Sequence, residues 1–199
     1  MVKPAAKLAT SGTRACHPPR LRAALAAICA ALLPGLAGAQ PVKDTPHSEP
    51  EVKAALLVKF LHYVEWPKKN APKPGEPVTI GFLGDDPIVA EFSRLVAGGY
   101  AVKGRAIAIK RSTNPDDLKN CQALFISKSA RSEAKGMLGA AQGSGKLTVS
   151  DIDRFRSLGG IIGFLSGGVS VRFEIDAAAA KKEGLIIHPA LLALGKPAN

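Results

Sequence analysis

Residues 147–175, LTVSDIDRFRSLGGIIGFLSGGVSVRFEI, constrain the fold more than any other part of this chain. The stretch opens with an apolar run, residues 147–149, that predicts a short buried strand, and a turn of helix over residues 153–158 follows it. Two β-rich runs, residues 161–165 and 169–175, then flank a short connection with two glycines, which indicates a hairpin. In the second run apolar residues alternate with polar ones, so we expect one face of that strand to be packed and the other to face water.

The rest of the chain extends this pattern into an α/β fold. Apolar β-branched runs at residues 78–83, 107–109 and 121–127 alternate with helical patterns at residues 51–66, 88–96 and 129–141. An alanine-rich helix after Asp176 and a short helix over residues 189–194 close the chain. We expect a mostly parallel sheet flanked by helices on both faces, with an antiparallel hairpin near the C-terminus.

The first 39 residues have the composition of a signal peptide. They hold five basic residues and no acidic one, a short apolar core, and the small residues Ala37-Gly38-Ala39 that a signal peptidase reads. We expect cleavage after Ala39, a flexible proline-rich leader over residues 40–50, and a single domain over residues 51–199; an uncleaved membrane anchor is the alternative. Without the segment the net charge falls from +11 to +6, because 22 basic and 16 acidic residues remain. That balance, with no basic helix carrying interleaved aromatics, does not indicate nucleic-acid binding.

Motifs of nucleotide binding and of catalysis are missing from the sequence. There is no phosphate-binding lysine loop, no glycine fingerprint after a strand and no nucleophile elbow. The histidines after residue 39 are scattered, so we expect neither a metal site nor a cofactor. The sequence Gly84-Asp85-Asp86-Pro87 has two interpretations: a strand-to-helix turn in which Asp86 caps the helix, or a carboxylate pair for acid–base or metal chemistry. Cys121 is the single cysteine after residue 39, which leaves burial or an intermolecular bridge open.

One loop is the candidate binding site for a ligand or partner: Asp151, Arg154, Gly159 and Gly160. Together with Arg156 and Arg172, Asp151 and Arg154 would form a polar cleft near the carboxyl ends of the central strands, where open α/β sheets bind ligands. The alternative is an Asp cap beside solvated loop charges.

Taken in order, the motifs of residues 51–194 resemble the YfiR-like family of small exported bacterial proteins. They are a helix ending in Trp-Pro, the Gly-Asp-Asp-Pro turn, a Gly-Arg strand, Cys-x-x-Leu-Phe-Ile-Ser, Leu-Thr-Val-Ser-Asp, a glycine pair and Arg-Phe-Glu-Ile. The motif residues that we expect to determine the fold are Phe60, Glu65, Trp66, Pro67, Gly84, Asp85, Asp86, Pro87, Cys121, Ser150, Arg172 and Phe173. Some family members carry internal disulfides, but this chain lacks a partner for Cys121, so redox control is not implied for it.

The resemblance implies a periplasmic regulator and not an enzyme. It implies a protein that binds the periplasmic sensor part of an inner-membrane diguanylate cyclase and lowers cyclic di-GMP signalling, a control of biofilm formation. It also implies an OmpA-like outer-membrane lipoprotein as a second partner, and a homodimer is plausible. The alternative functions are a periplasmic small-molecule sensor, which would need a polar pocket near Asp151 and Gly160, and a hydrolase, for which no spacing of residues argues.

Overall fold

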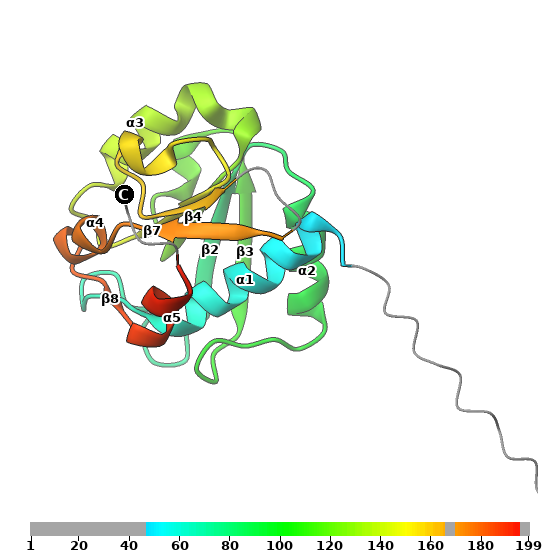
Figure 1. Ribbon diagram of the computed structural model, residues 1–199. Helices are drawn as coiled ribbons and strands as arrows, with labels where there is room; N and C mark the ends of the chain where they lie inside the picture. The colour runs from blue at the N-terminus through cyan, green and yellow to red at the C-terminus, as the bar shows by residue number, and fades with distance from the viewer. Residues whose placement is uncertain (1–46, 166–169, 196–199) are drawn as a thin grey trace, which may run out of the picture. The chain divides into compact units, whose positions relative to one another are not determined.

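A six-stranded sheet in the order β3-β2-β4-β5-β6-β7 forms the centre of the fold (Figure 1). The computed structural model describes residues 47–165 and 170–195. The strands of this sheet are β2 (Val78–Leu83), β3 (Ile107–Ser112), β4 (Ala123–Ile126), β5 (Leu147–Ser150), β6 (Ile162–Leu165) and β7 (Arg172–Ile175). All neighbouring pairs are parallel except β6 and β7, which are antiparallel. The predicted fold class and the C-terminal hairpin are therefore confirmed.

Helices cover both faces of the sheet. The α-helices are α1 (Glu49–Tyr63), α2 (Ile88–Ala97), α3 (Arg131–Ala141), α4 (Ala177–Lys182) and α5 (Pro189–Leu194), and the 3-10 helices are η1 (Pro115–Leu118), η2 (Lys128–Ala130) and η3 (Phe155–Leu158). The core residues of α1, α2, α4 and α5 join one hydrophobic cluster, and those of α3, η1 and η3 join another. Strand β4 separates the two clusters, because Ala123 and Phe125 pack into the first and Leu124 and Ile126 into the second. This alternation follows from the two-residue period of a strand.

The hairpin packs on α1 through aromatic rings. The ring of Phe60 lies 4.8 Å from that of Phe173 on β7 and 5.7 Å from that of Phe164 on β6, measured between centroids. Phe173 and Ile175 are buried, as the alternating pattern predicts. Val169 and the glycine connection lie outside the described residues.

Two local predictions were wrong. The first helix ends at Tyr63, and residues Val64–Glu65 form strand β1, which pairs antiparallel with β8 (Ile186–Ile187). The region around Lys103 and Gly104 is a tight turn closed by a Val102–Arg105 bridge, with positive φ at both turn residues, and not part of a strand. The strand that follows, β3, is correspondingly longer than expected and reaches Ser112.

Candidate functional site

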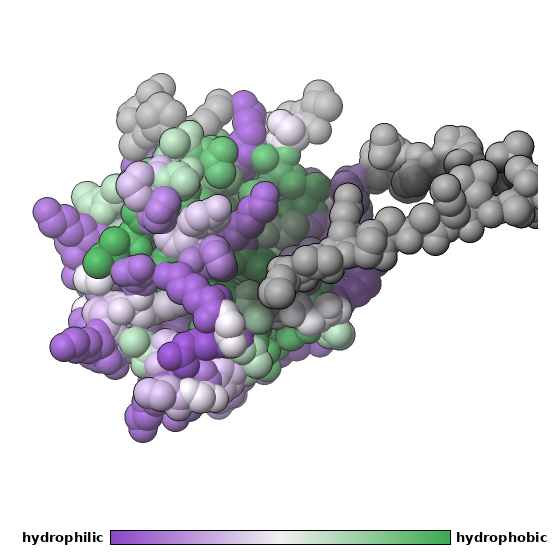
Figure 2. All heavy atoms as spheres, turned by 90° about the horizontal axis from the view of Figure 1, so that it is seen from below, coloured by the Kyte–Doolittle hydropathy of each residue, from purple (hydrophilic) through white to green (hydrophobic). Residues whose placement is uncertain are grey.

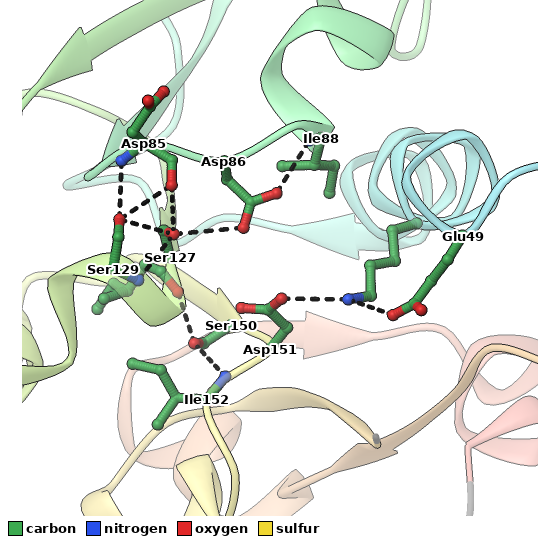
Figure 3. Close-up of polar contacts among 11 residues, drawn as sticks. Glu49, Asp85, Asp86, Ile88, Ser127, Ser129, Ser150, Asp151 and Ile152 are labelled. Carbon is green, nitrogen blue, oxygen red and sulfur yellow. Dashed lines mark hydrogen bonds and ion pairs between the residues drawn. The ribbon is translucent and has the colours of Figure 1, made fainter. Parts of the chain in front are cut away.

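Strands β2, β4 and β5 end side by side, at the point where the strand order reverses. The chain runs from β2 to β3 on one side and then returns to β4 on the other side of β2. In open α/β sheets, ligands bind in the crevice at such a switch point, outside the carboxyl ends of the strands. Figure 3 shows the polar residues that gather here.

The turn after β2 is held by hydroxyl groups that follow β4. The backbone N–H of Asp85 donates to Ser129 Oγ at 2.9 Å, and the hydroxyls of Ser127 and Ser129 donate to the carbonyl oxygen of Asp85, each at 2.9 Å. Asp86 Oδ1 accepts the N–H of Ile88, the first residue of α2, at 2.9 Å, although the N-cap position itself is held by Pro87. Burial, together with the charge of Asp151, raises the pKa of the Asp86 carboxyl. These bonds agree with the interpretation of Gly84-Asp85-Asp86-Pro87 as a strand-to-helix turn.

A serine joins the ends of β4 and β5 in the same way. The hydroxyl of Ser150 donates to the carbonyl oxygen of Ile126 at 2.5 Å and accepts the N–H of Ile152 at 2.9 Å. Ser150 is fully buried, and these two bonds satisfy its hydroxyl without water. They also fix the backbone direction of the next residue, Asp151.

The carboxylate of Asp151 is paired with a lysine from α1. Lys53 Nζ lies 3.1 Å from Asp151 Oδ2 and 2.7 Å from Glu49 Oε1, one helical turn away. The side chains of Lys53 and Asp151 are only 11% and 9% exposed, whereas that of Glu49 is 64% exposed. Burial alone would lower the pKa of Lys53, but its hydrogen bonds and charge attraction to Glu49 and Asp151 outweigh this and raise it. Asp151 Oδ1 is buried and has no hydrogen-bond partner.

The predicted cleft of Asp151 with three arginines does not form. Arg156 instead pairs with Glu174 Oε2 at 3.1 Å and approaches Asp176 Oδ2 at 3.9 Å. Arg154 is exposed and adopts a left-handed backbone conformation at the start of η3, and Arg172 is exposed on β7. The structure therefore corrects the prediction, because Asp151 takes its positive partner from α1 and is not a cap.

The two loop glycines have different surroundings. A Cβ atom at Gly160 would lie 2.1 Å from Cε1 of the Phe155 ring, so this ring fills the space where a pocket near Gly160 was expected. Gly159 ends η3 with a φ of 97°, and it lines a separate cavity on the side of α3 and α4. Gly160 is thus a packing residue, and Gly159 alone borders open space.

The other motif residues hold elements together. The Trp66 ring nitrogen donates to the carbonyl oxygen of Gln122 at 2.9 Å, and Pro67 lies where a Cβ on Gly145 would be. Glu65 pairs with Lys103 at 3.4 Å. Cys121 is buried, and this burial raises the pKa of its thiol. These placements agree with a structural role for the motif.

The part of the chain that the structure describes contains no group of three or more metal-ligating side chains placed to hold a metal ion. No helix among these residues is long and apolar enough to cross a membrane. Near the switch point, the buried Lys53–Asp151 ion pair joins α1 to the residue that follows β5. The chemistry that this arrangement offers is internal charge pairing.

An exposed apolar surface lies on β8 and α5, which we call the β8–α5 surface. Ile186 is 64% exposed, Leu192 39% and Leu194 65%. A hollow of about 310 Å³ borders Ile186 and is lined by His62, His188 and Lys103, among others. Figure 2 views the molecule from below, the side on which α5 and β8 lie in Figure 1, and shows hydrophobic residues at the surface between charged ones.

Comparison with known proteins identifies a family and a fold. A model of the YfiR/HmsC-like family matches residues 50–196. Among solved structures, a conserved domain protein from Vibrio cholerae O1 biovar El Tor aligns with a TM-score of 0.51 and 14% identity, over 75% of this chain and 60% of that one. The ABC domain from Streptococcus pneumoniae in complex with L-Trp aligns with a TM-score of 0.49 and 11% identity, over 72% of this chain and 59% of that one. This chain thus spans about 60% of the length of both solved structures. The similarity to the Vibrio cholerae protein shows the fold alone. No curated protein matches the sequence.

Proposed function

The chain belongs to the YfiR/HmsC-like family, and we propose that it is a periplasmic protein that represses a membrane-bound diguanylate cyclase by binding it. The observation that carries this proposal is the family match, which extends over residues 50–196. Export would follow from the signal peptide of residues 1–39, with cleavage after Ala39. N-terminal sequencing of the protein isolated from the periplasm tests that step.

The charged groups near the switch point pair with each other. Lys53 Nζ contacts Asp151 Oδ2 inside the fold, and we infer a structural role for this pair. We expect contacts with other proteins at exposed surfaces that carry large apolar side chains. The β8–α5 surface carries three such side chains, those of Ile186, Leu192 and Leu194. We assign the periplasmic sensor part of the cyclase to this surface.

Repression would act through conformational populations. A regulator that binds the inactive state of the cyclase more tightly than the active state shifts the equilibrium toward inactivity, by as much as the two affinities differ. An OmpA-like outer-membrane lipoprotein that competes for the repressor would release the cyclase. Both partners would bind the same small domain, and a homodimer would change the number of sites available to them.

Direct binding tests the proposal. The purified chain is titrated with the isolated periplasmic sensor part of a membrane diguanylate cyclase from the source organism, and the heat of binding is measured. We expect saturable binding that Ile186→Glu together with Leu194→Glu weakens at least tenfold, while Lys59→Glu, an exposed change on α1, leaves it unaltered. The absence of binding by the unmodified chain contradicts the proposal, and equal binding by both variants contradicts the assigned surface.

A further inference from the structure

The fold contains a second buried lysine, at the opposite end of β5 from Asp151. Lys146 directly precedes β5 and is only 8% exposed. Unlike Lys53, it takes part in none of the ion pairs found among the described residues. Burial lowers the pKa of Lys146, and interactions with Cys121 and Glu183 offset this only in part. A lysine at the wall of a cavity with no paired carboxylate can take its counter-charge from a bound anion.

The nearby glutamate is held by other groups. Glu183 Oε1 accepts the backbone N–H of Gly143 at 2.8 Å, and Oε2 accepts that of Gly145 at 3.0 Å. Both oxygens are therefore bound to the loop between α3 and β5. Glu183 lines the same cavity as Lys146, with its two oxygens engaged by this loop.

This cavity combines positive charge with apolar walls. It measures about 120 Å³, and Lys182 lines it together with Lys146. Thr148 Oγ1 accepts the N–H of Ile161 at 3.1 Å, and its hydroxyl keeps a proton to donate into the cavity. The apolar part of the wall comes from Leu138, Ala141, Ile161 and Ala179. An ammonium group and a hydroxyl next to aliphatic side chains suit an anion with a short hydrocarbon end.

The size of the cavity favours a small ligand. A closed cavity of roughly 150 Å³ accommodates a benzene molecule, so this cavity of about 120 Å³, which opens to solvent, surrounds roughly four or five non-hydrogen atoms of a ligand. Acetate and propionate have this size, carry one negative charge and match the apolar wall. We propose that the cavity beside Lys146 is a binding site for a short aliphatic monocarboxylate, whose carboxylate pairs with Lys146 and whose alkyl end packs on Leu138 and Ala179.

Thermal unfolding of the full chain at constant ionic strength tests this site. Sodium chloride is replaced stepwise by sodium propionate, sodium acetate or sodium phosphate at pH 7. We expect propionate and acetate to raise Tm saturably, by about 3–5 °C at a concentration tenfold above Kd, because a ligand that binds only the folded state stabilises it. Phosphate lacks the alkyl end and stabilises proteins by its exclusion from their surface, so we expect its effect on Tm to grow without saturation and to be the same in Lys146→Met.

Two variants locate the effect. Lys146→Met removes the charge and keeps the length of the side chain, so the propionate-dependent rise is expected to disappear. Ala179→Leu keeps the charge and fills the cavity, and it is expected to abolish the rise too. Lys119→Met, the same change at an exposed lysine, serves as the control and is expected to respond like the unmodified chain.

The comparison of salts on the unmodified chain is sufficient to overturn the proposal. If propionate and acetate give the Tm of chloride, or if their effect on Tm grows without saturation as that of phosphate does, the site does not bind a monocarboxylate. A rise that persists in Lys146→Met shows that the anion binds elsewhere. These results do not depend on a cyclase, so they are distinguishable from the outcome of the binding test above.

Discussion

Lys53 and Asp151 are 98 positions apart in the sequence, yet Lys53 Nζ lies 3.1 Å from Asp151 Oδ2 inside the domain. The pair joins α1 to the carboxyl end of β5. It is reinforced by the ring of Phe164, whose centroid lies 5.8 Å from Lys53 Nζ, at a distance typical of a cation–π contact. The first helix is thereby fixed over the sheet by charge as well as by its apolar face.

Removal of the lysine is expected to be costly. Lys53→Met leaves Asp151 as a buried charge without its partner, and we expect the free energy of unfolding to fall by about 3–5 kcal/mol. The double variant Lys53→Met/Asp151→Leu removes both charges and is expected to lose less than the single variant. Urea denaturation at pH 7 measures the free energy of unfolding of the unmodified protein, the single variant and the double variant. Lys59→Met, an exposed lysine on the same helix, is the control, and an equal loss in Lys59→Met and Lys53→Met would show that the pair has no special role.

The raised pKa of Asp86 predicts a pH-dependent gain of stability in Asp86→Asn. A carboxyl whose pKa is higher in the folded state stabilises the fold at low pH, and this contribution is lost as the pH rises through the folded pKa. Asparagine keeps an acceptor for the N–H of Ile88 but carries no charge at any pH. We therefore expect Asp86→Asn to be more stable than the unmodified protein at pH 7 and the difference to vanish below pH 3.8, the ordinary pKa of an aspartate.

Asp85→Asn is the matched control for that experiment. It makes the same change at the preceding residue, and the side chain of Asp85 is 95% exposed. We expect the stability of this variant at pH 7 to equal that of the unmodified protein. A lower stability of Asp86→Asn at pH 7 would contradict the account, because it would mean that the ionised carboxylate stabilises the fold.

Trp66 is expected to stabilise the domain through both packing and a hydrogen bond. Its ring is half-buried, so the loss on Trp66→Ala should be about 2–3 kcal/mol, below the range for a fully buried aromatic residue. Trp66→Phe keeps most of the packing and removes the bond to Gln122, which should cost about 1 kcal/mol. Urea denaturation of both variants separates the two contributions, and an unchanged midpoint in Trp66→Ala would rule out a structural role for the motif.

Gly160 should tolerate no larger side chain. Alanine at this position would overlap the ring of Phe155, and we expect a loss of about 1–3 kcal/mol as the ring moves. Gly136→Ala on α3 meets no neighbour, and we expect it to stabilise the protein by about 0.5–1 kcal/mol. Thermal unfolding compares the two, and stabilisation by alanine at Gly160 would mean that the ring does not fill this space.

The central strands were predictable because they are short, continuous apolar runs, and β7 was predictable because its apolar and polar side chains alternate. Ser150 and Asp176 were likewise predictable as residues that accept backbone N–H groups, since such short polar side chains follow or precede an element directly. Strand β1 was not predictable, because Val64 also continues the apolar stripe of α1, and only its pairing with Ile187 decides between the two.

The site was the least predictable part. Asp151 was singled out, but its partner was sought among Arg154 and Arg156, which are near it in the sequence, and Arg172 on the predicted hairpin. Arg156 pairs with Glu174, and the folded chain brings Lys53 from α1 instead. The one local signal was Glu49, four positions before Lys53, which indicates a helical ion pair but gives no sign that the lysine is buried. Lys146 carried no signal, because its burial depends on the packing of α3 and α4 around it.

The most direct test of the proposed function is the synthesis of cyclic di-GMP by membranes that contain a diguanylate cyclase of the source organism with a periplasmic sensor part. Increasing amounts of the purified chain are added to the sensor side of the membranes, and the rate of product formation is measured. The account predicts a saturable decrease in rate, and a variant with Ile186→Glu and Leu194→Glu that needs at least ten times more protein for the same decrease at an unchanged Tm. A rate that stays constant at saturating protein would contradict the account.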